Sequence, residues 1–304
     1  MSDATQVPLV SVIIPCRNHT RELEACLRSL ARQDLDAPFE TLVVDSAGDP
    51  QLRDVAARFP GVRSVGSDAV LEAGAARNLG AQHAAGSILA FVDADCEPEP
   101  GWLSALVAGL KAGGRLVGGP VSNARPFQVI RVADNLLQFA DSAPGRPDER
   151  ADHFPSCNMA IARADFQHIR GFPVIRFSAC EDVMFCETAK VVWPEGLRFV
   201  NGMRVKHLGR GRLMQYWRHQ EQFGYCRAAL NLRLRNEHRR LGRYAIMMVP
   251  VVLKRLSYIL GRAARWNRPG LLYAICLLPL LLFGLAGWAV GFRRGCVGAP
   301  ETGR

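Results

Sequence analysis

A chain of 304 residues is long enough to bury a large core, as one domain or as one domain with an appendage. Hydrophobic residues make up 49% of it and charged residues 22%, a balance that excludes an intrinsically disordered protein. The net charge of +10 is concentrated between residues 201 and 270, where 16 Arg and Lys stand against two Glu. Such a region suits either a nucleic acid or an anionic membrane as partner.

The nine cysteines show no C-x-x-C pair and no zinc-like spacing. In a chain of this length, that pattern favours free thiols in a reduced, intracellular setting. The N-terminal sequence MSDATQVPLV has no basic n-region and no apolar h-region of adequate length, so we expect no secretory signal.

The first 111 residues alternate between the hydrophobic periods of strands and helices. In the helix expected at 20–33, apolar residues recur at i, i+3, i+4 and i+7, which is the spacing of one helical face: Leu23, Cys26, Leu27 and Leu30. In chain order we expect strand 9–15, helix 20–33, strand 40–45, helix 50–59, strand 62–66, helix 74–85, strand 88–92 and helix 102–111.

Between residues 116 and 235 the pattern is looser, and no internal repeat occurs. We expect strand 116–121, helix 127–140, a polar loop at 141–156, strand 157–163, helix 181–192, strand 197–202 and a basic helix at 212–235. Strands that alternate with helices predict an α/β fold with a mainly parallel sheet and flanking helices. Ligands bind such sheets beyond the carboxyl ends of the strands, where Asp45 and Asp93 both fall.

Residues 271–290 form an uncharged run of 20, which is long enough to span the ~30 Å hydrocarbon core of a bilayer. Arginines flank the run on both sides, as expected of a transmembrane helix. A buried C-terminal helix is the alternative. Residues 245–260 contain Pro250, Lys254 and Arg255, so they favour an interfacial or re-entrant helix over a second span. A membrane is therefore preferred to a nucleic acid as the partner of the basic region.

Asp93 and Asp95 stand at i and i+2 after the apolar strand 88–92, so an extended backbone would turn both carboxylates to one side. Hard divalent cations prefer such oxygen ligands. The loop at 32–38 spells the same D-x-D pattern with Asp34 and Asp36. Spacing alone therefore decides nothing, and only the position at a strand end distinguishes the first pair.

Four other positions could carry chemistry. Asp45 could accept hydrogen bonds from a base or ribose, or could equally cap the next helix. Arg77 could pair with phosphate, although residues 72–80 match neither common phosphate-loop motif and could be an ordinary helix start. Glu181 and Asp182 open a helix, where acids are favoured electrostatically, but one of them could act as a general base. His207 follows a strand, and a lone histidine is usually not a ligand.

Taken in order, these features resemble the inverting family 2 glycosyltransferases, which have the GT-A fold. The motifs that carry the resemblance are SVIIPCRN (11–18), VVD (43–45), GAARNLG (74–80), FVDAD (91–95), CNMAIAR (157–163), CEDVMF (180–185) and VKHLG (205–209). The resemblance covers about residues 8–230. From the charge and hydropathy patterns we expect a catalytic domain at 1–210, a basic helical region on the membrane surface at 211–244 and a membrane-associated tail at 245–304, with one transmembrane helix at 271–290.

The resemblance also implies a role for each matching residue. The nucleotide would be bound by Pro15, Arg17, Asp45, Arg77 and Asp93. Mn²⁺ or Mg²⁺ on the diphosphate would be bound by Asp95, with Asp93 and His207 as further ligands. Asp182 would remove the proton of the acceptor hydroxyl, with Glu181 supporting the acceptor. One base and one metal suffice for a direct displacement that inverts the anomeric carbon, without the carboxylate nucleophile of a retaining glycosidase.

One motif departs from the family pattern. Processive members carry Gln-x-x-Arg-Trp on a helix beside the membrane, whereas this chain has Gln215, Trp217 and Arg218 followed by His219. With one expected span there is too little membrane structure for a polymer channel. We therefore expect a single addition, with these residues on the acceptor side; a structural helix packed on the bilayer is the alternative.

The expected partners are a nucleotide-sugar donor, most commonly a UDP-sugar in this family, a glycan or lipid-linked acceptor, and membrane lipid, but no nucleic acid. Because nucleotide sugars are cytosolic, the catalytic domain should face the cytoplasm from the cytoplasmic membrane. Two rival functions remain. A nucleotidyltransferase of similar fold would need a glycine-rich phosphate loop, which residues 13–23 lack. A non-catalytic nucleotide-binding membrane adaptor would not need Asp95 and Asp182.

Overall fold

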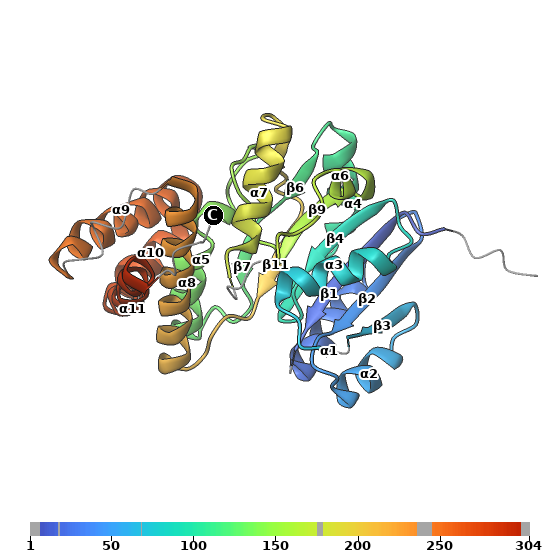
Figure 1. Cartoon of the computed structure of the whole chain (residues 1–304), viewed down its shortest axis with the longest axis horizontal. Coiled ribbons are helices and arrows are strands. Elements are labelled where there is room, and N and C mark those ends of the chain that lie inside the picture. Colours follow the sequence, from blue (N-terminus) through green and yellow to red (C-terminus); the bar gives the residue numbers. More distant parts are fainter. Residues whose placement is uncertain (1–6, 18, 68, 175–178, 236–244, 299–304) are drawn as a thin grey trace, which may run out of the picture. The chain divides into compact units, whose positions relative to one another are not determined.

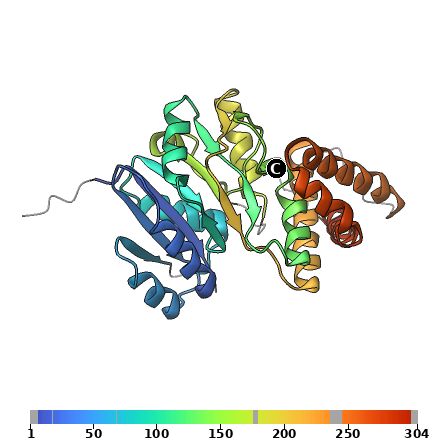
Figure 2. The same ribbon diagram turned by 180° about the vertical axis from the view of Figure 1, so that it is seen from behind.

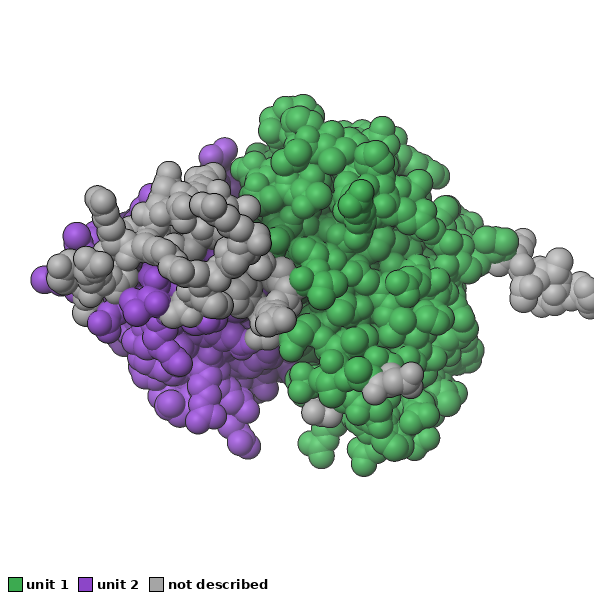
Figure 3. All heavy atoms as spheres, viewed as in Figure 1, with its two compact units in different colours: residues 1–122, 144–175, 181–207 green, residues 123–143, 176–180, 208–304 purple. Residues whose placement is uncertain are grey.

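The computed structural model describes residues 7–17, 19–67, 69–174, 179–235 and 245–298. They form two compact units, shown in different colours in Figure 3. Unit 1 comprises residues 1–122, 144–175 and 181–207, and unit 2 comprises residues 123–143, 176–180 and 208–304. The N-terminal residues 1–6, in which no signal is expected, and residues 236–244, which end the predicted basic region, lie outside the described residues.

Unit 1 is built on an eight-stranded sheet with the order β3-β2-β1-β4-β9-β6-β10-β8. Its strands are β1 (Val10–Cys16), β2 (Phe39–Asp45), β3 (Val62–Gly66), β4 (Ile88–Val92), β6 (Leu116–Gly118), β8 (Glu149–Arg150), β9 (Asn158–Ala162) and β10 (Leu197–Phe199). The first four strands are parallel, whereas β9 runs antiparallel to both β4 and β6. The expected mainly parallel sheet is confirmed.

Helices flank this sheet on both faces (Figures 1 and 2). They are α1 (Thr20–Leu30), α2 (Pro50–Ala57), α3 (Ala73–His83), α4 (Trp102–Lys111), α6 (Arg163–His168) and α7 (Glu181–Val192). In α1 the four apolar residues of the predicted face are all buried. The α/β alternation read from the first 111 residues therefore holds, with boundaries shifted by a few residues.

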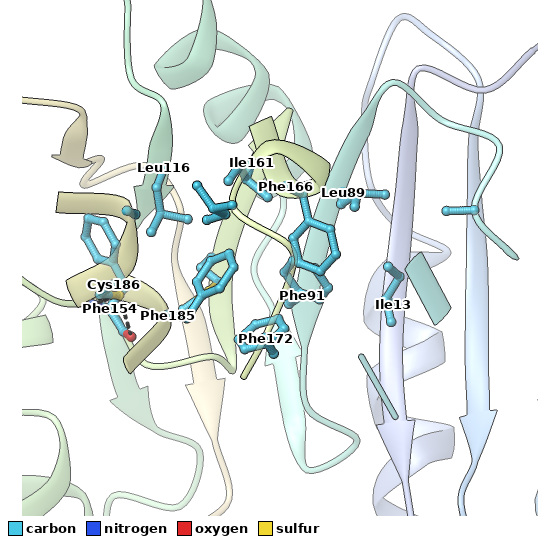
Figure 4. Close-up of a cluster of buried hydrophobic side chains, with 14 of the residues drawn as sticks. Ile13, Leu89, Phe91, Leu116, Phe154, Ile161, Phe166, Phe172, Phe185 and Cys186 are labelled. Atoms are coloured by element: carbon cyan, nitrogen blue, oxygen red, sulfur yellow. Dashed lines mark hydrogen bonds between the residues drawn. The ribbon is translucent and has the colours of Figure 1, made fainter. Parts of the chain in front are cut away.

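Aromatic side chains pack between the sheet and α7, as Figure 4 shows. The rings of Phe172 and Phe185 stack with their centroids 4.4 Å apart, and Phe91 of β4 meets Phe172 edge-on at 5.1 Å. These large buried rings contribute much of the apolar area removed from water. They hold the start of α7 against β4, which Asp93 follows directly, and so the candidate acids of both elements lie in unit 1.

A second sheet of unit 1 has the order β5-β11-β7, with β5 (Cys96–Pro98), β11 (Val205–His207) and β7 (Val121–Asn123). The sequence predicted a single strand at 116–121, which is wrong: β6 belongs to the large sheet and β7 to the small one. The intervening Gly119 lies against residue 203, where an added Cβ would stand 2.4 Å from the Met203 carbonyl oxygen. Only glycine fits such a close backbone approach.

Unit 2 is helical. It contains α5 (Val129–Gln138), α8 (Leu213–Arg235), α9 (Met248–Trp266), α10 (Arg268–Cys276) and α11 (Leu278–Gly298), with short 3₁₀ turns at Ala140–Ser142 and Ala245–Met247. Residues 245–260, expected to form an interfacial or re-entrant helix, lie mostly in the continuous α9, and their position at a membrane stays a prediction. Pro250 falls in the first turn of α9, where its missing N–H costs no hydrogen bond.

The uncharged run at 271–290 is divided between two helices. Helix α10 begins after Asn267, whose side chain accepts a hydrogen bond from the Gly270 N–H, and it ends at Cys276. Helix α11 is long and apolar enough to cross a membrane, judged by length and composition alone, and 56% of its most apolar window is buried within the protein. The crossing itself stays a prediction.

Candidate active site

The segment after β4 does not continue as an extended strand. The Cys96 N–H donates to the Asp93 carbonyl at 3.0 Å, which closes a turn over Ala94 and Asp95. The expectation that Asp93 and Asp95 point to one side of an extended backbone is therefore wrong. The turn gives the two carboxylates different partners: Asp93 pairs with Arg77, and Asp95 lies beside His207.

His207 reaches Asp95 through the small sheet. Antiparallel pairing of β5 with β11 sets His207 directly opposite Cys96. The His207 Nε2 lies 3.5 Å from the Asp95 Oδ2, and His207 is 6% exposed. Among the described residues, one group of His, Cys, Asp or Glu could hold a metal ion: Asp95, Cys96 and His207, whose ligand atoms all lie within 4.8 Å of one another.

The chemistry of this group fits Mn²⁺ or Mg²⁺ through two of its three members. A carboxylate oxygen and an imidazole nitrogen suit a hard or borderline divalent cation. Burial raises the pKa of the Cys96 thiol well above its ordinary value, and soft sulfur suits these hard cations less well than oxygen does. Two protein ligands leave most coordination positions for a diphosphate and water, as is usual for cations that bind nucleotides.

Arg77 of α3 connects the turn at residues 93–96, called the donor-side turn below, to the start of α7. Its Nη2 lies 2.5 Å from Asp93 Oδ1, and its Nη1 lies 2.8 Å from Glu181 Oε1. Burial alone would lower the pKa of Arg77, but the two carboxylates raise it above its ordinary value. The guanidinium, 1% exposed, is thus a permanent cation shared by two acids that lie 88 residues apart in the chain.

A glycine allows α3 and α7 to meet at this point. A Cβ added to Gly74, in the first turn of α3, would lie 3.2 Å from the Glu181 Cγ and 3.5 Å from the Phe172 Cβ. Because Gly74 has no side chain, Glu181 of α7 can approach α3 closely enough to pair with Arg77, which lies on α3 one turn after Gly74. The GAARNLG motif supplies both the space and the cation, rather than a phosphate loop.

Asp182 is held at the first turn of α7 by local donors. Its Oδ1 accepts the Val183 N–H at 2.8 Å, and its Oδ2 accepts the Ser156 N–H at 3.4 Å and lies 3.7 Å from His153 Nε2. Both acids stand at the helix N-terminus, whose partial positive charge favours anions. The carboxylate therefore keeps a fixed orientation before any substrate binds.

The two adjacent acids differ in proton affinity. Burial and the neighbouring charge of Asp182 raise the pKa of Glu181, although Arg77 acts in the opposite direction. Burial would also raise the pKa of Asp182, but the nearby His153, the hydrogen bond from the Val183 N–H and the charge of Arg77 act in the opposite direction, and the pKa is lowered. Asp182 is therefore the acid that stays ionised most readily and can accept a proton from a hydroxyl.

The strand-end residues of β1 and β2 organise neighbouring loops. The Asp45 Oδ1 accepts the N–H groups of Ala47, Gly48 and Asp49 at 2.8–3.1 Å, and Asp45 is 1% exposed. Asp45 therefore stabilises the turn before α2, while Asp49 caps that helix by accepting the Gln51 N–H. The predicted contact of Asp45 with a nucleobase stays a prediction.

Pro15 and Arg17 lie at the end of β1, beside the end of β2. Pro15 is half-buried and pairs in register with Val44, and Arg17 is exposed immediately after the strand. The Ser46 N–H and hydroxyl both donate to the Cys16 carbonyl, which ties the two strand ends together. These residues line the carboxyl edge of the parallel strands, where such sheets bind ligands, and their predicted nucleotide contacts remain untested.

Residues 11–170, just over half of the chain, match the family described as glycosyl transferase family 2. The chain belongs to the family 2 glycosyl transferases. Two curated relatives align with parts of it. Glycosyltransferase AglE of Haloferax volcanii is 34% identical over 126 residues, which cover 40% of this chain and 41% of the relative. Human polypeptide N-acetylgalactosaminyltransferase 15 is 41% identical over 70 residues, which cover 23% of this chain and 11% of the relative.

Solved structures show the same fold at low sequence identity. The mannosyltransferase PcManGT from Pyrobaculum calidifontis, in complex with GDP-Man and Mn²⁺, superposes with a TM-score of 0.59 at 20% identity, covering 96% of this chain and 88% of its own. S. aureus TarS 1–349 gives a TM-score of 0.52 at 16% identity, covering 94% of this chain and 89% of its own. GalNAc-T7 with UDP, GalNAc and Mn²⁺ gives a TM-score of 0.52 at 17% identity, covering 67% of this chain and 44% of its own. These likenesses establish the glycosyltransferase GT-A fold.

In this family 2 member the three residues predicted on the acceptor side belong to unit 2. Gln215 and Arg218 are exposed on α8, and Trp217 is half-buried with its ring 4.9 Å from that of Phe283. Within unit 1, Arg77 joins Asp93 to Glu181, and Asp95 lies beside His207. The acceptor role of the α8 residues stays a prediction.

Sequence reasoning missed three residues of the candidate site in unit 1. Cys96 was overlooked because the β5–β11 register is not visible in local sequence, and His153 and Ser156 because a polar loop carries no periodic signal. Arg77 was noticed, but its partners were not. Its position on the buried face of α3, next to small residues, was a usable signal: a buried cation needs acids around it.

A further buried acid, in unit 2, was also missed. Asp134 of α5 is fully buried, and its carboxylate accepts the Arg210 N–H at 2.9 Å and the Gln220 Nε2 at 3.1 Å. His219 Nδ1 lies 3.3 Å from the same carboxylate. Asp134 thus fastens the segment before α8 and the middle of α8 to α5. The helical pattern of 127–140 contained this aspartate on its apolar face, which was the signal available.

Proposed function

We propose that this chain is a metal-dependent inverting glycosyltransferase that moves a sugar from a nucleotide-sugar donor to a hydroxyl of a glycan or lipid-linked acceptor, in a single addition. The observation that carries the proposal is the pair of acid sites joined by Arg77. Asp95 with His207 forms a metal-binding donor side, and Asp182 forms a fixed, ionised base at the start of α7.

Different residues of the candidate site would carry out the different parts of the transfer reaction. A bound Mn²⁺ or Mg²⁺ would neutralise the charge that develops on the leaving nucleoside diphosphate. Asp95 and His207 would hold that cation, with Asp93 as the further predicted ligand, although Asp93 is paired with Arg77. Asp182 would take the proton from the attacking hydroxyl, whose oxygen forms the new bond to the anomeric carbon as the diphosphate leaves.

Inversion follows from the number of carboxylates available. A retaining mechanism by double displacement needs a second carboxylate as nucleophile. Glu181 is the adjacent candidate, but its Oε1 is engaged by Arg77 Nη1 and receives the Ser156 hydroxyl at 3.4 Å. We assign Glu181 to the support of the acceptor side, and the displacement is direct.

A UDP-sugar is our first candidate for the donor. The structural neighbours support a nucleotide sugar but differ among themselves: one is bound to GDP-Man, one to UDP and GalNAc, and TarS was solved with UDP-GlcNAc. For the nucleotide we propose contacts with Pro15, Arg17, Asp45, Arg77 and Asp93. Arg77 would act there through Asp93, since both of its terminal nitrogens face carboxylates.

We place the protein at the cytoplasmic face of the cytoplasmic membrane. The apolar α11 and the basic residues before it support a membrane position. A lipid-linked acceptor would be accessible there, with Gln215, Trp217 and Arg218 of α8 on the acceptor side. Nucleotide sugars are made in the cytosol, which supports that orientation of unit 1.

The test is a thermal-shift series on the full chain in detergent, with UDP, GDP, CMP and dTDP, each with and without Mn²⁺. We expect one nucleotide to raise the melting temperature only when the metal is present, because ligands that bind the native state stabilise it. Asp95→Asn should abolish that shift. Asp36→Asn, in the exposed D-x-D of the loop after α1, is the matched control and should retain it.

The same protein is then assayed for sugar transfer. No shift with any nucleotide, from protein shown to be folded, would overturn the donor site and favour the membrane adaptor. A metal-dependent shift without any transfer or donor hydrolysis would leave a nucleotide-binding protein that is not an enzyme.

A further inference from the structure

Helix α11 packs in parallel along α8 within unit 2. Going along α11, Gly284, Gly287, Gly291 and Gly295 contact α8 at Tyr216, Trp217, Glu221 and Tyr225 in that order. Because residue numbers rise together on both helices, the two run in the same direction. The contact follows α11 for three turns, so α11 is attached to α8 along more than half of its length.

The two backbones touch where the glycines lie. A Cβ added to Gly291 would stand 1.8 Å from the Glu221 carbonyl oxygen, and one added to Gly224 of α8 would stand 1.9 Å from the Trp288 carbonyl oxygen. The Tyr216 hydroxyl donates to the Leu280 carbonyl at 3.1 Å, and Arg294 pairs with Glu221. Side chains of any size would separate the helices, so this packing is specific to the glycines.

The part of α8 beside the centre of α11 is polar. Residues 218–222 read Arg-His-Gln-Glu-Gln, and this stretch lies alongside Gly287 to Gly291, the middle of α11. Gln215, Arg218 and Gln222 are exposed at i, i+3 and i+7, which is one face of the helix. If α11 crossed a bilayer in this packing, α8 would run beside it and place that face in hydrocarbon. Exposed charged and amide groups are strongly disfavoured there.

The surface that α10 and α11 leave uncovered is apolar. Leu272 is 64% exposed and Ile275 is 60% exposed, and Leu278 and Leu282 of α11 are also exposed. Cationic side chains stand before and after this stretch: Arg265 and Arg268 on one side, Arg293 and Arg294 on the other, all exposed. Apolar residues between cationic flanks are typical of helices that lie in the plane of an anionic membrane surface.

We propose that unit 2 binds an anionic lipid bilayer in the plane of its surface through α10 and the exposed stripe of α11, and that α11 does not cross the membrane. Leu272, Ile275, Leu278 and Leu282 enter the headgroup boundary, and the flanking arginines contact lipid phosphates. The inference rests on the proposed membrane position but not on the donor chemistry. It replaces the predicted span at 271–290 with a monotopic attachment.

The first test is the sidedness of the two ends of this region. Exposed Cys276 is changed to Ser, and a single cysteine is introduced as Arg268→Cys or as Arg293→Cys; the other native cysteines are buried. Sealed right-side-out and inverted membrane vesicles from expressing cells are treated with an impermeant maleimide. We expect both cysteines to react from the cytoplasmic side only. Labelling from opposite sides would show that the chain crosses between them and would overturn the proposal.

The second test is binding to vesicles of phosphatidylglycerol and phosphatidylcholine. Leu272→Asp with Ile275→Asp should weaken binding by about tenfold or more, because two exposed apolar side chains that would enter the bilayer are lost. Val191→Asp, an 82% exposed position in unit 1, is the matched control and should bind like the unaltered chain. Circular dichroism verifies that the variants are folded.

Unaltered protein that does not bind anionic vesicles, or a double variant that binds as well as the control, would overturn the proposal. Neither readout uses a sugar donor. A wrong donor assignment would therefore leave both results unchanged, and a failure here would leave the nucleotide-dependent thermal shift intact.

Discussion

The donor-side turn and the start of α7 each contain a pair of acids close in sequence, and both pairs are divided in the same way. One member of each pair, Asp93 or Glu181, goes to Arg77, and the other, Asp95 or Asp182, lies beside a histidine. The two pairs differ in how deeply the histidine is buried and in the function proposed for the acid beside it. His207 is buried with the metal-binding group, whereas the side chain of His153 is 36% exposed at the base.

This comparison shows how one cation can serve two acid pairs. Arg77 neutralises the member of each pair that would otherwise repel its neighbour, and the proposed roles in metal binding and proton removal fall to the other members, Asp95 and Asp182. The arrangement joins the donor side and the base into one electrostatic unit, so damage to Arg77 should affect both sides while damage to a histidine should affect one. The following substitutions test that difference.

Arg77→Gln should have the largest effect. It leaves the buried carboxylates of Asp93 and Glu181 without their cation, and breaking a buried ion pair costs about 3–5 kcal/mol of unfolding free energy. Urea denaturation measures the loss. Arg63→Gln is the matched control, since the pair Arg63–Glu40 is over half exposed on the arginine side and should cost at most about 1 kcal/mol. Equal losses in the two variants would contradict the central place given to Arg77.

Asp182→Asn should lower the transfer rate by about 10²–10⁴-fold, the range for loss of a general base. Nucleotide binding should be unaffected, because Asp182 faces Ser156 and His153 rather than the metal-binding group. Initial rates and nucleotide-dependent thermal shifts on one preparation measure both effects. A variant that transfers sugar at the original rate would remove Asp182 from the mechanism.

His207→Ala should weaken Mn²⁺ binding by at least the ~10–100-fold seen when a supporting group at a metal site is lost. The concentration of Mn²⁺ needed for half of the nucleotide-induced thermal shift is the measurement. His153→Ala, which removes the other histidine, should leave that concentration unchanged. If both variants shift it equally, the two acid pairs do not have separate functions.

His153→Gln should have the smallest effect, visible mainly in the pH dependence. The lowered pKa of Asp182 contributes stability above the ordinary aspartate pKa, and this contribution is lost as the pH falls through the folded-state pKa. Replacing His153 removes one of the groups that lower the pKa of Asp182, so this pKa rises. The acid limb of the rate profile should therefore move to higher pH, and an unmoved limb would exclude His153 as the cause.

The sequence allowed the alternation of strands and helices and the strand-end positions of Asp45 and Asp93 to be predicted, because both depend on local periodicity. It did not allow the direction of Asp95 to be predicted, since the turn at 93–96 is fixed by the pairing of β5 with β11, more than 100 residues later in the chain. The division of 116–121 between two sheets was hidden for the same reason: it depends on the contact of Gly119 with Met203.

For the C-terminal region, prediction from the sequence was limited for a different reason. Hydropathy alone could not distinguish a bilayer from a protein interior as the apolar environment of 278–298. The spacing of Gly284, Gly287, Gly291 and Gly295 was visible in the sequence and indicated close helix packing, but its partner, α8, could be named only from the structure.

Residues 123–143 belong to unit 2 although they lie between two segments of unit 1 in the sequence, and this order affects how the chain folds during synthesis. Helix α5 leaves the ribosome well before α8 and α11, which are needed to bury its apolar face of Val132, Leu136 and Leu137. Until then this face is a site for chaperones or for aggregation. A chain stopped at residue 210 would keep α5 but lose its partners, so a soluble catalytic fragment should be obtained by replacing residues 123–143 with a short polar linker, and not by C-terminal truncation alone.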